Sequence, residues 1–201
     1  MGNREDLLAG ARQCLFDKGY DRTTVRDIAI AAGVSMAAIG YHFGSKEALL
    51  SEALAAATRD WGTELAGAVA DSSQTAVPAG RFEARWDAVI DSIATHRGLW
   101  SATFDALAHP EIRDRLAGTL GEARSGLARL IEGLDEATEA AARATPPATD
   151  TEAVGALYQV LLTGLAAHQL IDADSTPRGR DLARAIRFVA DRLEAEDPPS
   201  A

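Results

Sequence analysis

The side chains with the most evident binding chemistry lie near the N-terminus, around two glycine-containing turns. Arg26 precedes the first turn, and Tyr41, His42 and Lys46 surround the second. Guanidinium, phenol, imidazole and ammonium groups can all donate hydrogen bonds to phosphate oxygens, and a guanidinium can also bind a guanine edge through two hydrogen bonds. Lys46 also stands at an expected helix start, where backbone N–H groups and the helix dipole favour a phosphate. These residues predict contacts with a nucleic acid.

Three short helices are expected to position these side chains. An apolar stripe over 7–16 predicts the first helix, which ends near Lys18. Thr24 is a good N-cap for the second helix, and Asp27 three residues later resembles the acidic member of a capping box. Gly33 suits the tight turn that follows, and Ser35 can cap the third helix. Two helices joined by such a turn form a helix-turn-helix, whose second helix enters the major groove of DNA.

Two segments, "LFDKGYDRTTVRDIAIAAGVS" and "IGYHFGSKEALL", make the comparison more specific. The region from Leu7 to Leu54 resembles the DNA-binding domain of the TetR repressor family. The resemblance implies a helix-turn-helix domain over residues 1–50 and a variable domain over 51–201. It further implies that the second domain binds a small molecule and forms a homodimer through its last two long helices.

The recognition helix departs from the family pattern. Met36, Ala37 and Ala38 stand where Lys-Gly-Thr is common, and Gly40 replaces an aromatic residue. Ala and Met can contact a thymine methyl group, so Arg26 is the main candidate for a polar base contact. The alternative for Arg26 is a surface ion pair with Asp27 or Asp21. The predicted DNA-binding set is Thr24, Arg26, Ser35, Met36, Ala37, Ala38, Gly40, Tyr41, His42 and Lys46.

Helical periodicity continues along the rest of the chain. It predicts an all-α fold of about nine helices, with one long helix starting at Ser45 and leaving the N-terminal domain without a linker. The segment from Asp71 to Gly80 is expected to be a loop, and further helices are expected around 82–93, 99–107, 112–134, 154–170 and 182–193.

Aromatic residues concentrate in three consecutive predicted helices. The resemblance places a pocket for an apolar or aromatic effector there, and an ordinary aromatic core is the alternative reading. A cationic group on the ligand would fit if Asp87 or Asp91 faced it. The predicted pocket residues are Trp61, Trp86, Ile90, Trp100, Phe104 and Leu120.

The last two predicted helices carry more apolar surface than one bundle face requires. They are either central helices of the bundle or, as the resemblance implies, a two-fold four-helix interface between two copies. The predicted dimer residues are Leu157, Leu161, Leu165, Leu182, Ile186 and Val189.

Charge and composition exclude several functions. Residues 1–50 hold six basic and six acidic side chains, so the remainder carries the whole net charge of −10, which argues against a general polyanion binder. Cys14 is the sole cysteine and is expected to be a core residue. His96, His109 and His168 are too dispersed to predict a metal site, and no cofactor and no catalytic group is expected. The polar start "MGNREDLLAG" and the lack of a long apolar run predict a cytoplasmic protein without a membrane span.

The sequence therefore favours a homodimeric regulator that binds a palindromic double-stranded DNA operator, most simply a repressor that a small molecule releases. The competing hypothesis is a helical small-molecule binding or catalytic module whose helix-turn-helix no longer reads DNA.

Overall fold

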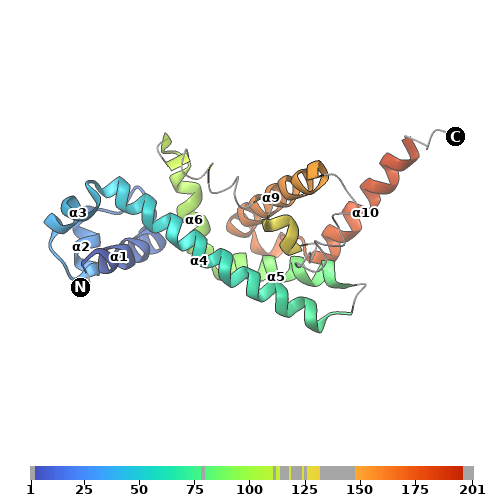
Figure 1. Cartoon of the computed structure of the whole chain (residues 1–201), viewed down its shortest axis with the longest axis horizontal. Helices are drawn as coiled ribbons and strands as arrows, with labels where there is room; N and C mark the ends of the chain where they lie inside the picture. The colour runs from blue at the N-terminus through green and yellow to red at the C-terminus, as the bar shows by residue number, and fades with distance from the viewer. Residues whose placement is uncertain are drawn as a thin grey trace. The chain divides into compact units, whose positions relative to one another are not determined.

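The computed structural model describes residues 3–77, 80–110, 112–113, 118, 124, 126–131 and 148–196. Within these residues the chain forms eight α-helices and one 3₁₀ helix, residues 126–131 are also helical, and no strand occurs, which confirms the all-α prediction (Figure 1). Packing divides the chain into two compact units. The first comprises Met1–Glu64 and His96–Ala123, and the second comprises Leu65–Thr95 and Arg124–Ala201. The predicted division at residue 50 is one of function and stays a prediction.

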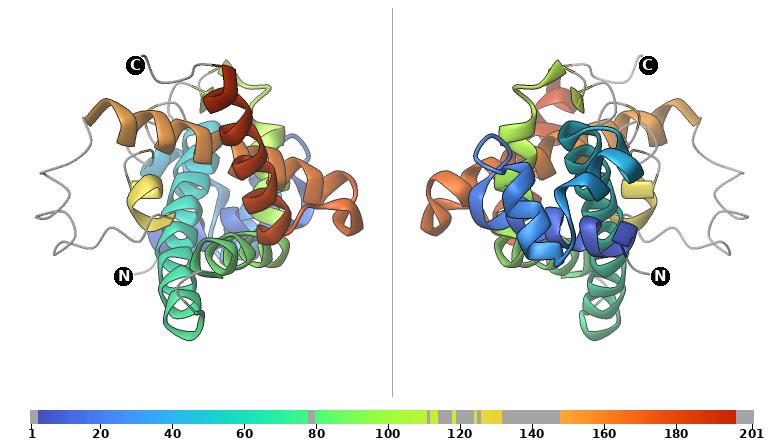
Figure 2. Two further views of the ribbon diagram at one scale, coloured as in Figure 1. Left: turned by 90° about the vertical axis from the view of Figure 1, so that its right-hand side faces the viewer. Right: turned by 90° about the vertical axis from the view of Figure 1, so that its left-hand side faces the viewer.

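The first unit contains the three N-terminal helices, the start of a long fourth helix, and a later helix. These are α1 (Asn3–Lys18), α2 (Val25–Ala32), α3 (Met36–Phe43), the first part of α4 (Lys46–Thr75) and α6 (Arg97–Ala106). Helix α1 packs against α2, α3 and α6, as Figure 2 also shows for α1 to α3. The core between them is built from side chains that are almost fully buried: Leu7, Leu15, Tyr20, Ile28, Ile39, Leu49 and Leu50.

Local hydrogen bonds set the ends of the short helices. The Thr24 hydroxyl accepts a hydrogen bond from the Asp27 amide, and the Asp27 carboxylate accepts one from the Thr24 amide, so the predicted capping box is confirmed. Gly33 ends α2 with φ of 66°, a left-handed conformation that glycine adopts without strain. Ser35 stands at the N-cap position of α3, but its hydroxyl makes no capping hydrogen bond, so that part of the prediction is wrong.

The second unit is built around α5 (Arg81–Thr95), α9 (Ala148–Ile171) and α10 (Gly179–Glu196), with a short 3₁₀ helix η2 (Ala173–Ser175) before α10. Helix α5 packs against both α9 and α10. At the start of α10, the Arg178 guanidinium pairs with Asp87 and Asp91 of α5, and the Gly179 amide donates to Asp87 at 2.9 Å. These contacts fasten the N-terminal end of α10, and Arg187 in its middle pairs with Glu83 of α5 at 3.5 Å.

One expectation about the rest of the chain changes, and two others need comment. Helix α4 runs on to Thr75, so 71–75 is helical and not part of a loop. Most of the helix expected over 112–134 lies outside the described residues. In α9, the segment Thr151–Ile171 is long and apolar enough to cross a membrane by length and composition, which the sequence reading did not note. A core or interface helix meets the same criterion, so the segment is weak evidence for a membrane span.

Candidate nucleic-acid interface

Helix α3 presents most of its predicted reading residues on an exposed face. It is anchored by Ile39, which is 2 % exposed, whereas Met36 is 56 % exposed and Tyr41 is 86 % exposed. Ala37 and Gly40 are also exposed, and Ala38 is half-buried. One face of α3 is therefore packed against the core of its unit. The opposite face exposes methyl groups, the backbone at Gly40 and the Tyr41 phenol.

Arg26 differs from the other cations of the N-terminal unit. Its side chain is exposed on α2 and makes no ion pair or hydrogen bond within the described part of the chain. The alternative of an ion pair with Asp27 or Asp21 is not found, because Asp27 pairs with Lys18 and Asp21 pairs with His109. The other five basic residues in 1–50 all have partners: Arg4, Arg12, Lys18, Arg22 and Lys46.

Three further donors on or beside α3 are uncommitted. The Tyr41 hydroxyl, the His42 ring nitrogens and the Ser35 hydroxyl make no hydrogen bond within the described residues. The Tyr41 and His42 rings meet edge to face, with centroids 4.9 Å apart. These side chains can therefore donate to an external acceptor without breaking an internal hydrogen bond.

Lys46 and Thr24 are more deeply engaged than the sequence suggested. The Lys46 ammonium donates to the Thr23 carbonyl oxygen at 3.2 Å and lies 5.9 Å from the centre of the Tyr20 ring. The Thr24 hydroxyl donates to Asp27 at 2.7 Å in addition to its capping role. Lys46 still has protons to spare, because an ammonium has three, whereas the Thr24 donors are used inside the capping box.

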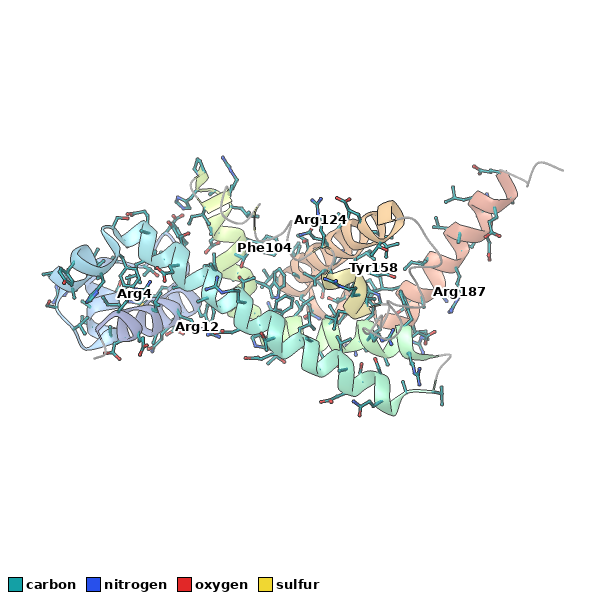
Figure 3. All side chains as sticks on the ribbon, viewed as in Figure 1. Arg4, Arg12, Phe104, Arg124, Tyr158 and Arg187 are labelled. Atoms are coloured by element: carbon teal, nitrogen blue, oxygen red, sulfur yellow. The ribbon has the colours of Figure 1, made fainter. Side chains whose placement is uncertain are left out.

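Two arginines that the motif analysis did not use fasten α1 to α4. Arg4 pairs with Glu52, and Arg12 pairs with Asp60 at 2.7 Å. Both pairs join residues 48 positions apart, so the bridges lie two turns apart along both helices (Figure 3). Arg4 also lies over the Phe43 ring at 5.0 Å, which ties the end of α3 into the same junction. The only sequence signal was the repeated spacing of opposite charges.

Electrostatics strengthen the start of α2. Hydrogen bonds from Lys18 and Thr24 lower the pKa of the Asp27 carboxyl to about 2, and the same contact with Asp27 raises the pKa of Lys18. Asp27 therefore stays ionised and keeps its capping role over the whole neutral range. Cys14 is 5 % exposed, and burial raises the pKa of its thiol, as expected for a core residue.

The predicted pocket residues fall into two aromatic clusters. In the first unit, the Trp61 and Trp100 rings meet edge to face at 5.1 Å, and Phe104 lies 6.3 Å from Trp100. In the second unit, Trp86 meets Tyr158 edge to face at 5.5 Å, and Ile90 is buried in the same unit. Leu120 lies outside the described residues.

The Trp86 indole is fully buried, and its N–H has no acceptor within the described residues. Asp87 and Asp91 do not offer free carboxylates to a cationic ligand, because both pair with Arg178.

The predicted dimer residues are not equally available to a partner. Leu165 is 4 % exposed and belongs to the core of its own unit, and Leu161, Leu182 and Ile186 are half-buried. Leu157 and Val189 are about half exposed, at 48 % and 55 %. Sequence reasoning missed the more exposed apolar side chains of the same helices: Val160, Ile171, Phe188 and Leu193.

Two of the three dispersed histidines pair with carboxylates. His96 contacts Glu64, and His109 contacts Asp21. A search of the described residues for groups of three or more His, Cys, Asp or Glu that could hold a metal ion finds none.

Comparisons with known proteins place the N-terminal region in a family. Residues 7–53 match the model of the bacterial regulatory proteins of the tetR family. The HTH-type transcriptional repressor AcnR of Corynebacterium efficiens is 37 % identical over 83 residues, covering 41 % of this chain and 42 % of that protein. The HTH-type transcriptional repressor KstR2 of Mycolicibacterium smegmatis is 32 % identical over 106 residues, covering 53 % and 43 %. Each match thus spans less than half of the curated relative.

Solved structures show a similar fold over almost the whole chain. A transcriptional regulator from Rhodococcus sp. Rha1 has a TM-score of 0.61 at 20 % identity and covers 96 % of both chains. A transcriptional regulator from Aquifex aeolicus has a TM-score of 0.56 at 17 % identity, covering 94 % of this chain and 99 % of the other. This likeness concerns the fold, whereas the match over residues 7–53 is one of sequence. The sequence of residues 7–53 is thus similar to the tetR-family model, and the fold of the chain is similar to that of solved transcriptional regulators.

Proposed function

We propose that this protein is a cytoplasmic transcriptional repressor that binds a palindromic DNA operator as a homodimer and is released by a small-molecule effector. The observation that carries the proposal is the isolation of Arg26. Among the six cations of residues 1–50, all of which are described, Arg26 is the one without a partner. The curated relatives support the proposal because they are named transcriptional repressors, which are regulators rather than enzymes.

Different parts of the interface have different roles in this proposal. Arg26 reads a guanine through two hydrogen bonds, which contributes about 1–3 kcal/mol of discrimination. Met36 and Ala37 contact thymine methyl groups, and the half-buried Ala38 lies at the edge of that face. Gly40 allows the helix backbone to approach the DNA closely. Sequence-dependent DNA shape supplies further specificity, since few base-edge hydrogen bonds remain.

Phosphate contacts position the helix-turn-helix on the DNA but carry no information about the base sequence. Tyr41, His42 and Ser35 have uncommitted donors for this purpose. Lys46 contributes its remaining protons at the start of α4. Thr24 acts indirectly, because its capping box fixes the first turn of α2, which carries Arg26.

The test begins with selection of bound sequences from a random DNA library, followed by affinity measurements on the selected site. Arg26→Ala is expected to lower affinity about ten- to a hundredfold and to relax selection at one base pair. Arg22→Ala is the matched control, because Arg22 is an exposed arginine of the same unit whose guanidinium already donates to the Lys18 carbonyl oxygen. An unenriched library would overturn the proposal in favour of a module that does not read DNA. Equal losses for both variants would remove Arg26 from the reading surface.

The dimer is proposed to form on exposed faces of α9 and α10. Val160 is 69 % exposed on α9, and Phe188 and Leu193 are 65 % and 62 % exposed on α10. Every residue from Arg187 to Glu196 is exposed, and this half of α10 extends beyond the other helices of its unit (Figure 1). Arg187 pairs with Glu83 of α5, but the large apolar side chains of this half stay exposed. Such side chains require a partner to bury them, and a second copy supplies the same surface.

The effector is proposed to be an apolar or aromatic compound that binds in the second unit beside Phe82, Trp86 and Tyr158. The support is the buried Trp86 N–H without an acceptor in the described chain, which calls for a ligand with a hydrogen-bond acceptor. Helix α4 passes unbroken from the first unit into the second, so it is the proposed route of coupling. A coupling of about 1–3 kcal/mol would change DNA affinity about 5- to 150-fold.

A ligand screen by thermal shift, repeated with Trp86→Phe, tests this part. The variant keeps an aromatic ring and removes the indole N–H. Hits that bind the variant equally well would contradict the role of Trp86.

A further inference from the structure

Ile30 on α2 is an exposed isoleucine that the proposed function does not use. Residues 3–64 expose three large hydrophobic side chains, Ile30, Met36 and Tyr41, and all three lie on α2 and α3. Ile30 is 70 % exposed, more than Met36. The longer helix α1 exposes none, so these side chains are not scattered singly over the surface, as isolated exposed hydrophobic residues usually are. A reading surface confined to Arg26 and α3 leaves Ile30 unexplained.

Ile30 lies on the same side of α2 as Arg26. Residues four positions apart are neighbours on a helix surface, and helical side chains lean towards the N-terminus, so the Ile30 side chain leans towards Arg26. The opposite side of α2 packs closely on α1. A Cβ added at Gly10 of α1 would come 2.9 Å from the Ala32 amide nitrogen and 3.1 Å from the Ile28 carbonyl oxygen. Arg26 and Ile30 therefore share the side of α2 that is turned away from α1 and is open to a ligand.

Backbone hydrogen bonds join Ile30 to the turn that leads into α3. The Gly33 amide donates to the Ile30 carbonyl oxygen at 3.2 Å, and the Val34 amide donates to the Ala29 carbonyl oxygen at 3.1 Å. Met36 begins α3 directly after this turn. A short hydrogen-bonded turn thus fixes the place of Ile30 relative to the start of the recognition helix.

We propose that Ile30 reads a thymine methyl group on the base pair next to the guanine that Arg26 reads. This inference rests on the proposed function, and it makes α2 a second source of sequence specificity beside α3. The C5-methyl group of thymine and the O6 and N7 atoms of guanine all face the major groove. The side chain of isoleucine ends in methyl groups and has no hydrogen-bonding atom, so it suits the thymine methyl group and cannot bond to a phosphate.

The spacing of the two side chains fits neighbouring base pairs. Four residues of α-helix span about 6 Å along the axis, and successive base pairs are about 3.4 Å apart. The lean of Ile30 towards Arg26 and the length of the arginine side chain bring the two ends within one base step of each other. A guanine contact and a methyl contact from one side of α2 therefore require adjacent base pairs.

An apolar contact has consequences that separate Ile30 from the phosphate contacts. Ile30 carries no charge, so its loss should lower affinity by the same factor at low and at high salt. Loss of a phosphate contact from Lys46 should instead flatten the dependence of affinity on salt. Because Ile30 is exposed and alanine has the higher helix propensity, Ile30→Ala should not lower the free energy of unfolding.

The experiment uses the DNA site selected with the unmodified protein, in which the guanine read by Arg26 is the one whose selection Arg26→Ala relaxes. The adjacent thymine is replaced by deoxyuridine, which lacks only the C5-methyl group. This change should weaken binding by the unmodified protein about fourfold, the effect of burying one methyl group. Ile30→Ala should weaken binding to the thymine site about three- to tenfold and should then bind the thymine and deoxyuridine sites equally.

Two further variants complete the test. Val77→Ala is the matched control, because Val77 is also β-branched and is 72 % exposed in the second unit, and it should leave the deoxyuridine effect unchanged. Ile30→Val keeps two methyl groups at the same place and should retain the preference for thymine. Chemical denaturation of all three variants checks that weaker binding does not come from unfolding.

Three results would each overturn the inference while leaving the proposed function in place. The first is a selected site without thymine beside the guanine, and the second is equal affinity of Ile30→Ala and the unmodified protein. The third is a deoxyuridine effect of the same size in Ile30→Ala and in the unmodified protein. Failure to select any DNA site would instead overturn the proposed function, and this inference with it.

Discussion

The two units of the molecule use their exposed side chains in opposite ways. In the first unit, five of the six cations of residues 1–50 are held by partners in the same unit, and the exposed exception is Arg26. In the second unit, ion pairs from Arg178 and Arg187 hold the first half of α10 to α5, and the exposed second half carries Phe188 and Leu193. One uncommitted charge is suited to a specific polar contact, whereas a row of uncommitted apolar groups is suited to burial against another helix.

The largest expected effect comes from placing charges on the apolar end of α10. Phe188→Asp with Leu193→Asp should weaken the proposed dimer by at least about 30-fold, because hot-spot side chains contribute 2 kcal/mol or more and a buried charge costs further energy. The measurement is molar mass by sedimentation equilibrium over a range of concentrations. Val77→Asp is the control, because Val77 is similarly exposed, at 72 %, and lies outside these helices. Unchanged association in the double variant would show that α10 does not form the interface.

The next effect concerns how α10 is attached to its own unit. An added Cβ at Gly179 would collide with the Glu83 carbonyl oxygen and come 2.9 Å from its carbon, and a backbone atom cannot move aside as a side chain can. Gly179→Ala should therefore lower the free energy of unfolding by about 1–3 kcal/mol, measured by chemical denaturation. Gly62→Ala on α4, where nothing lies within 4 Å, should instead stabilise by about 0.5–1 kcal/mol. Equal effects at the two glycines would disprove the close approach of α10 to α5.

Local features of the first unit were predictable because they depend on neighbours in sequence. The Thr24–Asp27 capping box and the Gly33 turn involve contacts within a few residues, and both are confirmed. Whether Arg26 forms an ion pair was not predictable in this way. Whether Asp21 is available to it depends on His109, which is 88 residues away. The sequence allowed two roles for Arg26, a DNA contact or a surface ion pair, and only tertiary contacts decide between them.

In the second unit, periodicity predicted the helices but not their buried faces. Helix α9 is apolar on more than one side, so leucine spacing could not separate Leu165, which is buried in the unit, from Val160, which is 69 % exposed. The same all-round apolarity gives Thr151–Ile171 the composition of a membrane span. Helix α4 continues through 71–75, where the Ser72 and Ser73 hydroxyls donate to the Val69 carbonyl oxygen within the helix, so their polarity did not mark a loop.

A smaller effect is expected from Gly40→Ala in α3, which should change stability and DNA affinity in opposite directions. Gly40 is exposed in the interior of α3 with no atom near an added Cβ, so Gly40→Ala should raise the free energy of unfolding by about 0.5–1 kcal/mol. If DNA approaches the backbone there, the same variant should bind its site more weakly. Gly67→Ala on α4, which is equally open, should give the stability gain without the loss of binding. A Gly40→Ala variant that binds DNA as tightly as the unmodified protein would remove Gly40 from the interface.

The smallest expected effect comes from removing the charge of Asp27, which pairs with Lys18 and caps α2. The folded-state pKa of Asp27 is lowered to about 2, below the value of about 3.9 for an unfolded chain, so its stabilisation is complete above about pH 4 and is lost as pH falls through about 2. Asp27→Asn should therefore be less stable than the unmodified protein at pH 5, and the difference should shrink towards pH 2, as measured by urea unfolding at each pH. Asp17→Asn, at an exposed carboxylate on α1 with no partner in the described chain, is the matched control and should show little change. A difference for Asp27→Asn that stays constant with pH would show that the Lys18 pair and the capping box do not depend on the ionised carboxylate. Packing of α2 against α1 would then have to account for the stability of the start of α2.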